Sequence, residues 1–164
     1  MSAETPLTSE AISDLDPFAW VGRVLTNFAA AEQAIGILCS KLDLPINNGS
    51  LTSMAELRQR LRHSADRKCS ALEKRIDRWN SNRPFRHLLA HATVQILRDA
   101  SGGIVVVTRR LPLDASDVTT DRNWTGDERR ELLRQATNDG RSIRDHVSGF
   151  LRDPVTLAKL RRPA

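Results

Sequence analysis

The sequence lacks several features that mark membrane, secreted and zinc-binding proteins. It contains only two cysteines and four histidines among 164 residues, and the C-x-x-C and Cys/His spacings of zinc sites are absent. Its longest apolar runs fall far short of the roughly 18 residues that cross a bilayer. Residues 1–10 have neither the basic nor the apolar region of a secretory signal. We therefore expect no membrane segment, no bound metal and no other cofactor.

The two cysteines give a further indication. Cys39 and Cys69 both fall on apolar faces of predicted helices, where a reduced core thiol is the usual role, so we expect a cytoplasmic protein. The chain is 40% hydrophobic and 27% charged, which is typical of a soluble globular chain rather than a disordered one. Its length suits one domain with a real core.

Acidic residues are scarce where basic residues are concentrated. Only four of the 25 basic residues are lysines, the rest being arginines, and the net charge is +5. Residues 56–91 carry ten basic side chains and four acidic ones. Because the planar guanidinium matches phosphate oxygens, an arginine stripe indicates a polyanion site. A solvated helical face is the alternative interpretation of the same stripe.

Apolar residues recur at helical spacing over much of the chain. Asp14 or Asp16 can cap the first helix, and Thr125 with Glu128 forms a capping box for the last long one. Gly140 falls on the apolar face of that last helix, so we expect another helix to approach it closely. Besides the segment described below, the periodicity predicts helices over residues 16–42, 51–62, 66–79 and 125–152.

The period changes between residues 94 and 124. Two β-branched runs, 94–97 and 104–108, flank a loop that contains two glycines, which predicts a β-hairpin. Residues 111–124 are expected to form an irregular connection. The predicted fold is therefore mainly α, a four-to-five-helix bundle with a small β-hairpin inserted before the last long helix. We expect a flexible tail over 1–13, a helical domain over 14–153 and a basic tail over 154–164.

Residues 82–93, N-R-P-F-R-H-L-L-A-H-A-T, combine two arginines and two histidines with a helical apolar pattern. Pro84 suits the first turn of a helix, and three apolar residues are expected to face the core: Phe85, Leu88 and Ala92. His87 and His91 share a face because they are four residues apart. Arg86 and His91 are about 140° apart around an ideal helix. They converge on one target only if the first turn is distorted or a symmetry mate supplies one of them.

Two interpretations of these histidines stay open from the residues alone. They are either half-buried helix histidines that bind backbone carbonyls, or a functional site with Arg83 and Arg86 beside them. A zinc hydrolase built on His87 and His91 would need a third ligand, and neighbouring positions offer no Asp, Glu or Cys.

The motif and its setting resemble the HEPN superfamily (higher eukaryotes and prokaryotes nucleotide-binding domains). Members are helical bundles that carry R-polar-x-x-x-H at the start of a late helix. In this sequence Arg86 matches the arginine, His87 the polar residue and His91 the histidine. The amphipathic first helix, with F-A-A-A-E at residues 28–32, extends the resemblance over most of residues 17–152.

The resemblance implies a metal-independent endoribonuclease that works as a homodimer on RNA, with two motif copies facing across the interface. In such an enzyme His91 is the general base and Arg86 stabilises the phosphate. His87 orients the substrate or serves as general acid, and the products are a 2′,3′-cyclic phosphate and a 5′-hydroxyl. Three further arginines would bind flanking phosphates: Arg75, Arg78 and Arg83.

One departure from the family pattern concerns regulation. Many family toxins that are paired with a nucleotidyltransferase antitoxin carry a tyrosine two residues after the motif histidine, where this chain has Thr93. The chain has no tyrosine at all, so silencing by tyrosine modification is excluded. An antitoxin or other protein partner acting in another way is compatible with the sequence.

The function classes therefore reduce to three. The first is an endoribonuclease that serves as a toxin or antiphage effector. The second is a non-catalytic, HEPN-like dimeric module that binds RNA or a protein, since some family members have lost catalysis. The third is a purely structural helical dimer whose arginines only solubilise it.

Overall fold

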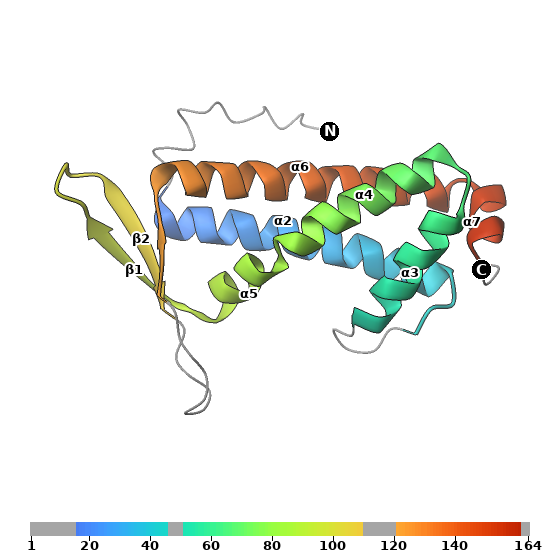
Figure 1. Ribbon diagram of the computed structural model, residues 1–164, viewed down its shortest axis with the longest axis horizontal. Coiled ribbons are helices and arrows are strands. Elements are labelled where there is room, and N and C mark those ends of the chain that lie inside the picture. The colour runs from blue at the N-terminus through green and yellow to red at the C-terminus, as the bar shows by residue number, and fades with distance from the viewer. Residues whose placement is uncertain (1–15, 46–50, 110–120, 162–164) are drawn as a thin grey trace. The chain divides into compact units, whose positions relative to one another are not determined.

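The structure, a computed structural model, describes residues 16–45, 51–109 and 121–161. Its described part is mainly helical, with a small antiparallel sheet before the last long helix, as expected (Figure 1). The elements in chain order are α2 (Pro17–Lys41), α3 (Leu51–His63), α4 (Arg67–Ser81), α5 (Arg83–His91), β1 (Thr93–Arg98), β2 (Ile104–Arg109), β3 (Arg122–Trp124), α6 (Gly126–Leu151) and α7 (Pro154–Arg161). The expected tail over 1–13 lies outside the described residues.

Helix boundaries follow the caps expected from the sequence. The Asp16 carboxylate accepts hydrogen bonds from the backbone N–H of Phe18 at 2.9 Å and of Ala19 at 3.1 Å, and α2 begins there. The Thr125 backbone N–H donates to Glu128 at 2.9 Å, and the Glu128 backbone N–H donates to the Thr125 hydroxyl at 3.3 Å. These reciprocal bonds are the predicted capping box, and they satisfy amide groups that α6 itself leaves without acceptors.

Two segments differ from the expectation. Part of the connection predicted to be irregular forms strand β3, whose Trp124 lies opposite Val106 of β2. Residues 154–161 of the expected basic tail form helix α7. Asp153 caps it, accepting from the Thr156 backbone N–H at 3.1 Å and the Thr156 hydroxyl at 2.8 Å, and Leu160 is buried. Both elements depend on partners distant in sequence, which local patterns do not reveal.

The described residues fall into two compact units, and helices α2 and α6 each contribute to both. Unit 1 contains residues 16–25 and the described part of 84–135, which includes most of α5 and the sheet. Unit 2 contains the described residues of 26–83 and of 136–161, which include α3, α4 and α7. Each unit has its own packed interior, so each is described by itself.

An aromatic cluster forms the interior of unit 1. The rings of Trp20 and Trp124 lie 5.5 Å apart, and Phe85 meets Trp124 edge-on at 5.4 Å. Both indole N–H groups are satisfied: Trp20 donates to the Arg129 carbonyl at 2.9 Å, and Trp124 donates to the Thr108 hydroxyl at 3.0 Å. Burying these rings while pairing their N–H groups joins α2, α5, β3 and α6 within the unit.

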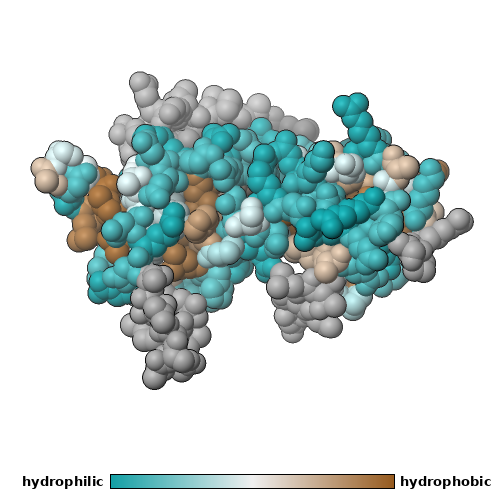
Figure 2. All heavy atoms as spheres, in the orientation of Figure 1, coloured by the Kyte–Doolittle hydropathy of each residue, from teal (hydrophilic) through white to brown (hydrophobic). Residues whose placement is uncertain are grey.

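The sheet of unit 1 has the order β1-β2-β3, with both neighbouring pairs antiparallel. Residues 94–97 and 104–108, predicted as a hairpin, lie within β1 and β2. Apolar side chains around this hairpin are exposed: Ile96, Leu97 and Ile104. Figure 2 shows the corresponding brown surface around β1 and β2.

Unit 2 packs helices around apolar side chains from α2, α3, α4, α6 and α7. Phe28 and Trp79 rings lie 6.0 Å apart within it. A Cβ atom on Gly140 would lie only 2.9 Å from the Asn27 carbonyl oxygen, so the predicted close approach of another helix at this glycine is confirmed. Its largest fully buried side chains include Phe28, Leu38, Leu57, Leu61, Leu72, Ile76, Trp79, Ile143 and Phe150.

Candidate functional site

A break in the helical backbone sets the start of the motif helix. Helix α4 ends at Ser81, and Asn82 closes it with φ −92° and ψ −5°, its backbone N–H reaching the Trp79 carbonyl at 3.1 Å. Pro84 explains the break, because it has no N–H for an i→i−4 bond and its ring would crowd the preceding turn. Helix α5 then begins at Arg83, with Pro84 in its first turn as predicted.

The two motif histidines lie together on α5. Their ring centroids are 4.6 Å apart at an interplanar angle of 55°, and both side chains are exposed. The shared face predicted from their spacing is therefore confirmed. A neutral imidazole has one donor nitrogen and one acceptor nitrogen, so two rings this close can serve as proton acceptor and proton donor.

The buried face of α5 differs slightly from the prediction. Leu89 is its buried residue, with 3% exposed, whereas Phe85, Leu88 and Ala92 are half-buried. Phe85 is nevertheless held by its contact with Trp124. Phe85 and Leu89, four residues apart, thus form the inner edge, which turns the histidines outward.

Arg86 lies half-buried in the same α-helix as His91. Five residues along a helix amount to about 140° of rotation and about 7.5 Å of rise. Since α5 is helical over its whole length, the motif arginine and histidine of one chain occupy different faces of it.

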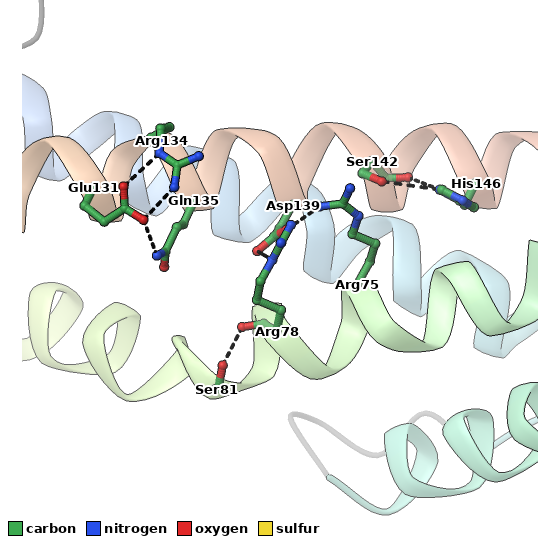
Figure 3. Close-up of polar contacts among 9 residues, drawn as sticks. All are labelled: Arg75, Arg78, Ser81, Glu131, Arg134, Gln135, Asp139, Ser142 and His146. Carbon is green, nitrogen blue, oxygen red and sulfur yellow. Dashed lines mark hydrogen bonds and ion pairs between the residues drawn. The ribbon is translucent and has the colours of Figure 1, made fainter. Parts of the chain in front are cut away.

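Arg75 and Arg78 belong to unit 2, where both bind the carboxylate of Asp139 (Figure 3). Arg78 Nε lies 2.9 Å from Oδ1 and 3.1 Å from Oδ2, and its Nη2 also donates to Oδ1. Arg75 Nη1 lies 3.3 Å from Oδ1. These two side chains thus come from α4 and meet on one acidic residue of α6.

Arg83, the third arginine expected to bind flanking phosphates, also belongs to unit 2. Its guanidinium carbon lies 5.6 Å from the centre of the Trp79 ring, a cation–π contact. The structure therefore brings together His87 and His91 in unit 1, and Arg75 and Arg78 in unit 2.

Two residues near these sites were missed by the sequence analysis. Arg122 lies over both Phe85, at 4.6 Å, and Trp124, at 4.2 Å, and its Nη2 pairs with Glu128 at 3.2 Å.

The second residue that the sequence did not single out is Asp139, the acid that binds Arg75 and Arg78. A carboxylate three residues after Ala136 on the apolar stripe of the last helix was the available signal for a buried charge.

Among the residues that the structure describes, no three His, Cys, Asp or Glu side chains are grouped so as to hold a metal ion. No helix in the described ranges is both long and apolar enough to cross a bilayer. No protein-family model matches the chain, and neither a curated protein nor a solved structure is significantly similar to it.

Proposed function

We propose that the protein is a metal-independent endoribonuclease of HEPN type that acts as a homodimer. The observation that carries this proposal is the pair of exposed imidazoles on α5, His87 and His91, with ring centroids 4.6 Å apart and Arg86 on the same helix. Both rings are exposed and tilted against each other at 55°, so they contribute little to the packed interior of unit 1.

The proposed reaction uses the nucleophile that RNA itself carries. His91 takes the proton of a ribose 2′-hydroxyl, and the 2′-oxygen forms a bond to phosphorus. The bond from phosphorus to the 5′-oxygen breaks, and His87 donates a proton to that leaving oxygen. Arg86 binds the non-bridging oxygens, where negative charge develops. The products are a 2′,3′-cyclic phosphate and a 5′-hydroxyl, so atoms and protons balance.

A second copy of the chain completes this site. Arg86 and His91 diverge by about 140° on one helix. A two-fold arrangement of two α5 helices would let the partner subunit's Arg86 face the His91 of the first chain across a shared groove. The proposal therefore predicts that a monomer is inactive.

In unit 2, Arg75, Arg78 and Arg83 are proposed to bind phosphates elsewhere on the RNA. Their side chains are accessible to different degrees, since Arg75 is 39% exposed and Arg78 is 50% exposed. Binding that depends on phosphate contacts releases counterions, so the affinity should fall steeply as salt rises.

The test is cleavage of RNA in excess EDTA by the full chain. Arg86→Ala and His91→Ala should each reduce the cleavage rate by about 10²–10⁴-fold. His63→Ala is the matched control, because this exposed histidine lies at the end of α3, where its ring contacts the Gln59 carbonyl of the same helix at 2.8 Å. The expected product ends are identified by mass spectrometry. Equal cleavage by folded wild type and His91→Ala would overturn the proposal.

A non-catalytic RNA-binding module is the second candidate. The exposed arginines of α4 favour it, because they need no participation of α5 to bind phosphates. This candidate predicts salt-sensitive RNA binding without cleavage, and the same affinity in His91→Ala as in wild type. Cleavage and binding measured on one preparation separate the two functions.

A further inference from the structure

A single buried carboxylate organises two half-exposed arginines in unit 2. Asp139 is only 1% exposed, whereas the side chains of Arg75 and Arg78 are 39% and 50% exposed. In Figure 3 both guanidinium groups extend from α4 toward Asp139 on α6. The acid is thus hidden beneath the two cations, which keep part of their surface in solvent.

The hydrogen bonds leave both guanidinium groups with donors to spare. Arg78 binds Asp139 through Nε and Nη2, and Arg75 binds it through Nη1 alone. A guanidinium has five N–H donors, so most of the donors of the pair are not used by Asp139. Two bonded nitrogens fix the guanidinium plane of Arg78, and the single bond of Arg75 restrains one end of its guanidinium, so the remaining donors sample fewer rotamers than those of an unpaired arginine.

The charge balance around Asp139 differs from that of the ion-pair cluster around Asp77 and Glu73 of α4. Asp77 of α4 pairs with Arg58 and lies 3.7 Å from Arg62, while Arg62 also binds the buried Glu73 at 2.6 Å. Two acids there neutralise two arginines. At Asp139 one acid meets two arginines, which leaves a net positive charge at the surface.

We propose that Asp139 is a positioning residue that holds Arg75 and Arg78 as a two-armed site for one phosphodiester group of RNA. This inference rests on the proposed function, because it assumes that RNA is the ligand. Two oriented guanidiniums recognise the non-bridging oxygens of a phosphate through paired hydrogen bonds. A flexible arginine would have to lose its rotamer freedom on binding, and here Asp139 has already removed it.

The direction in which Asp139→Asn changes the affinity for RNA distinguishes a positioning role of Asp139 from an effect of overall charge. Asp139→Asn removes a negative charge, so bulk electrostatics predicts tighter RNA binding. The positioning role predicts weaker binding, because the neutral amide no longer attracts both guanidinium groups. Asp77→Asn is the matched control: it removes the same charge from the partner helix α4, yet Asp77 does not contact Arg75 or Arg78 in any described ion pair.

The experiment measures equilibrium binding of the full chain to a fluorescein-labelled 2′-O-methyl RNA, which lacks the 2′-hydroxyl nucleophile and so remains intact. Asp139→Asn should weaken binding about 3–10-fold, while Asp77→Asn leaves it unchanged or strengthens it. Arg75→Ala and Arg78→Ala should each lower the salt dependence, and the double variant should lower it by about the one phosphate contact that the pair shares. Binding by folded Asp139→Asn that is equal to or tighter than wild type overturns the proposal.

A second variant keeps the test decisive if Asp139→Asn does not fold. Arg78→Lys retains the charge but loses the planar fork, so positioning predicts weaker binding and bulk charge predicts no change. EDTA-resistant cleavage by wild type is measured in parallel. If wild type cleaves RNA but Asp139→Asn or Arg78→Lys binds RNA as tightly as wild type, only the positioning role is overturned. A wild type that binds no RNA at low salt overturns the proposed function as well.

Discussion

Helix α6 carries two buried charges in contrasting surroundings, one in each compact unit. Asp139 in unit 2 is 1% exposed and binds two guanidinium groups, those of Arg75 and Arg78. Arg129 in unit 1 is 5% exposed, and its Nε has no hydrogen-bond partner in the described part of the chain. Burial lowers the pKa of Arg129, and the like charge of Arg130 lowers it further.

The difference lies in compensation: hydrogen bonds replace the lost hydration of one buried charge, whereas the other has no such replacement at its Nε. Asp139 accepts hydrogen bonds that compensate for its lost hydration, and so it joins α4 to α6 within unit 2. Arg129 is desolvated without an acidic partner among the described residues, which is an energetic cost.

Removing both partners of Asp139 should have the largest effect. Arg75→Ala combined with Arg78→Ala leaves a carboxylate buried without a counter-charge, so the free energy of unfolding should fall by about 3–5 kcal/mol. Urea denaturation followed by circular dichroism measures it. Adding Asp139→Leu should restore part of the loss, because no buried charge then remains. A double variant that loses less than about 1 kcal/mol would contradict the stabilising role of this cluster.

A substitution at Gly140 tests whether a steric clash beside Asp139 lowers stability as the loss of its arginine partners does. Gly140→Ala places a methyl group 2.9 Å from the Asn27 carbonyl oxygen, a backbone atom that moves little. Overpacking should outweigh the helical preference of alanine and reduce the free energy of unfolding by about 1–2 kcal/mol. Gly149→Ala on the same helix is the control, since nothing lies within 4 Å, and it should stabilise by about 0.5–1 kcal/mol. Equal melting temperatures for the two variants would refute the close approach.

Removing the charge of Arg129 should raise the free energy of unfolding, whereas the changes around Asp139 lower it. Arg129→Met keeps the length of the side chain but removes the unpaired charge, so the free energy of unfolding should rise by about 1 kcal/mol. Arg130→Met is the control, because Arg130 is half-buried and pairs with the exposed Asp127. A clear loss of stability in Arg129→Met, measured by the same urea titration, would mean that the guanidinium has a compensating partner.

The exposed cluster at Glu131 should have the smallest effect. Glu131 accepts from Arg134 at 2.6 Å and from Gln135 at 2.5 Å, and the Arg134 hydrogen bond lowers its pKa. Because solvent screens this pair, Glu131→Gln should cost only about 0.3–0.5 kcal/mol at pH 7. A carboxyl whose folded pKa is lowered stabilises above its unfolded pKa. The difference in the free energy of unfolding between wild type and Glu131→Gln should therefore disappear as the pH falls below about 4. A stability difference that persists at pH 2 would show that it does not come from the ionisation of Glu131.

Much of the helical pattern could be predicted because its signals are local. Asp16, Pro84 and the Thr125–Glu128 box act on the first turn of their own helices, so four neighbouring residues suffice to reveal them. The shared face of His87 and His91 follows equally from helical geometry. Local patterns therefore gave both the motif helix and its outward side.

Other features depend on residues far along the chain. The three residues of β3 take their pairing from β2, and α7 is held through the buried Leu160. Asp139 was visible as an acid on an apolar stripe, but no local pattern names Arg75 and Arg78 as its partners, more than 60 positions earlier. The local pattern around those two arginines indicates only a phosphate site or a solvated helical face.

Periodicity and caps thus determined by themselves where the helices from α2 to α6 lie, and that a hairpin precedes the last long one. Tertiary packing alone decided which charges are buried and which of those find a partner. The physical reason is range: backbone hydrogen bonds and side-chain spacing act within a few residues, whereas desolvation and ion pairing depend on whichever segment the fold brings alongside.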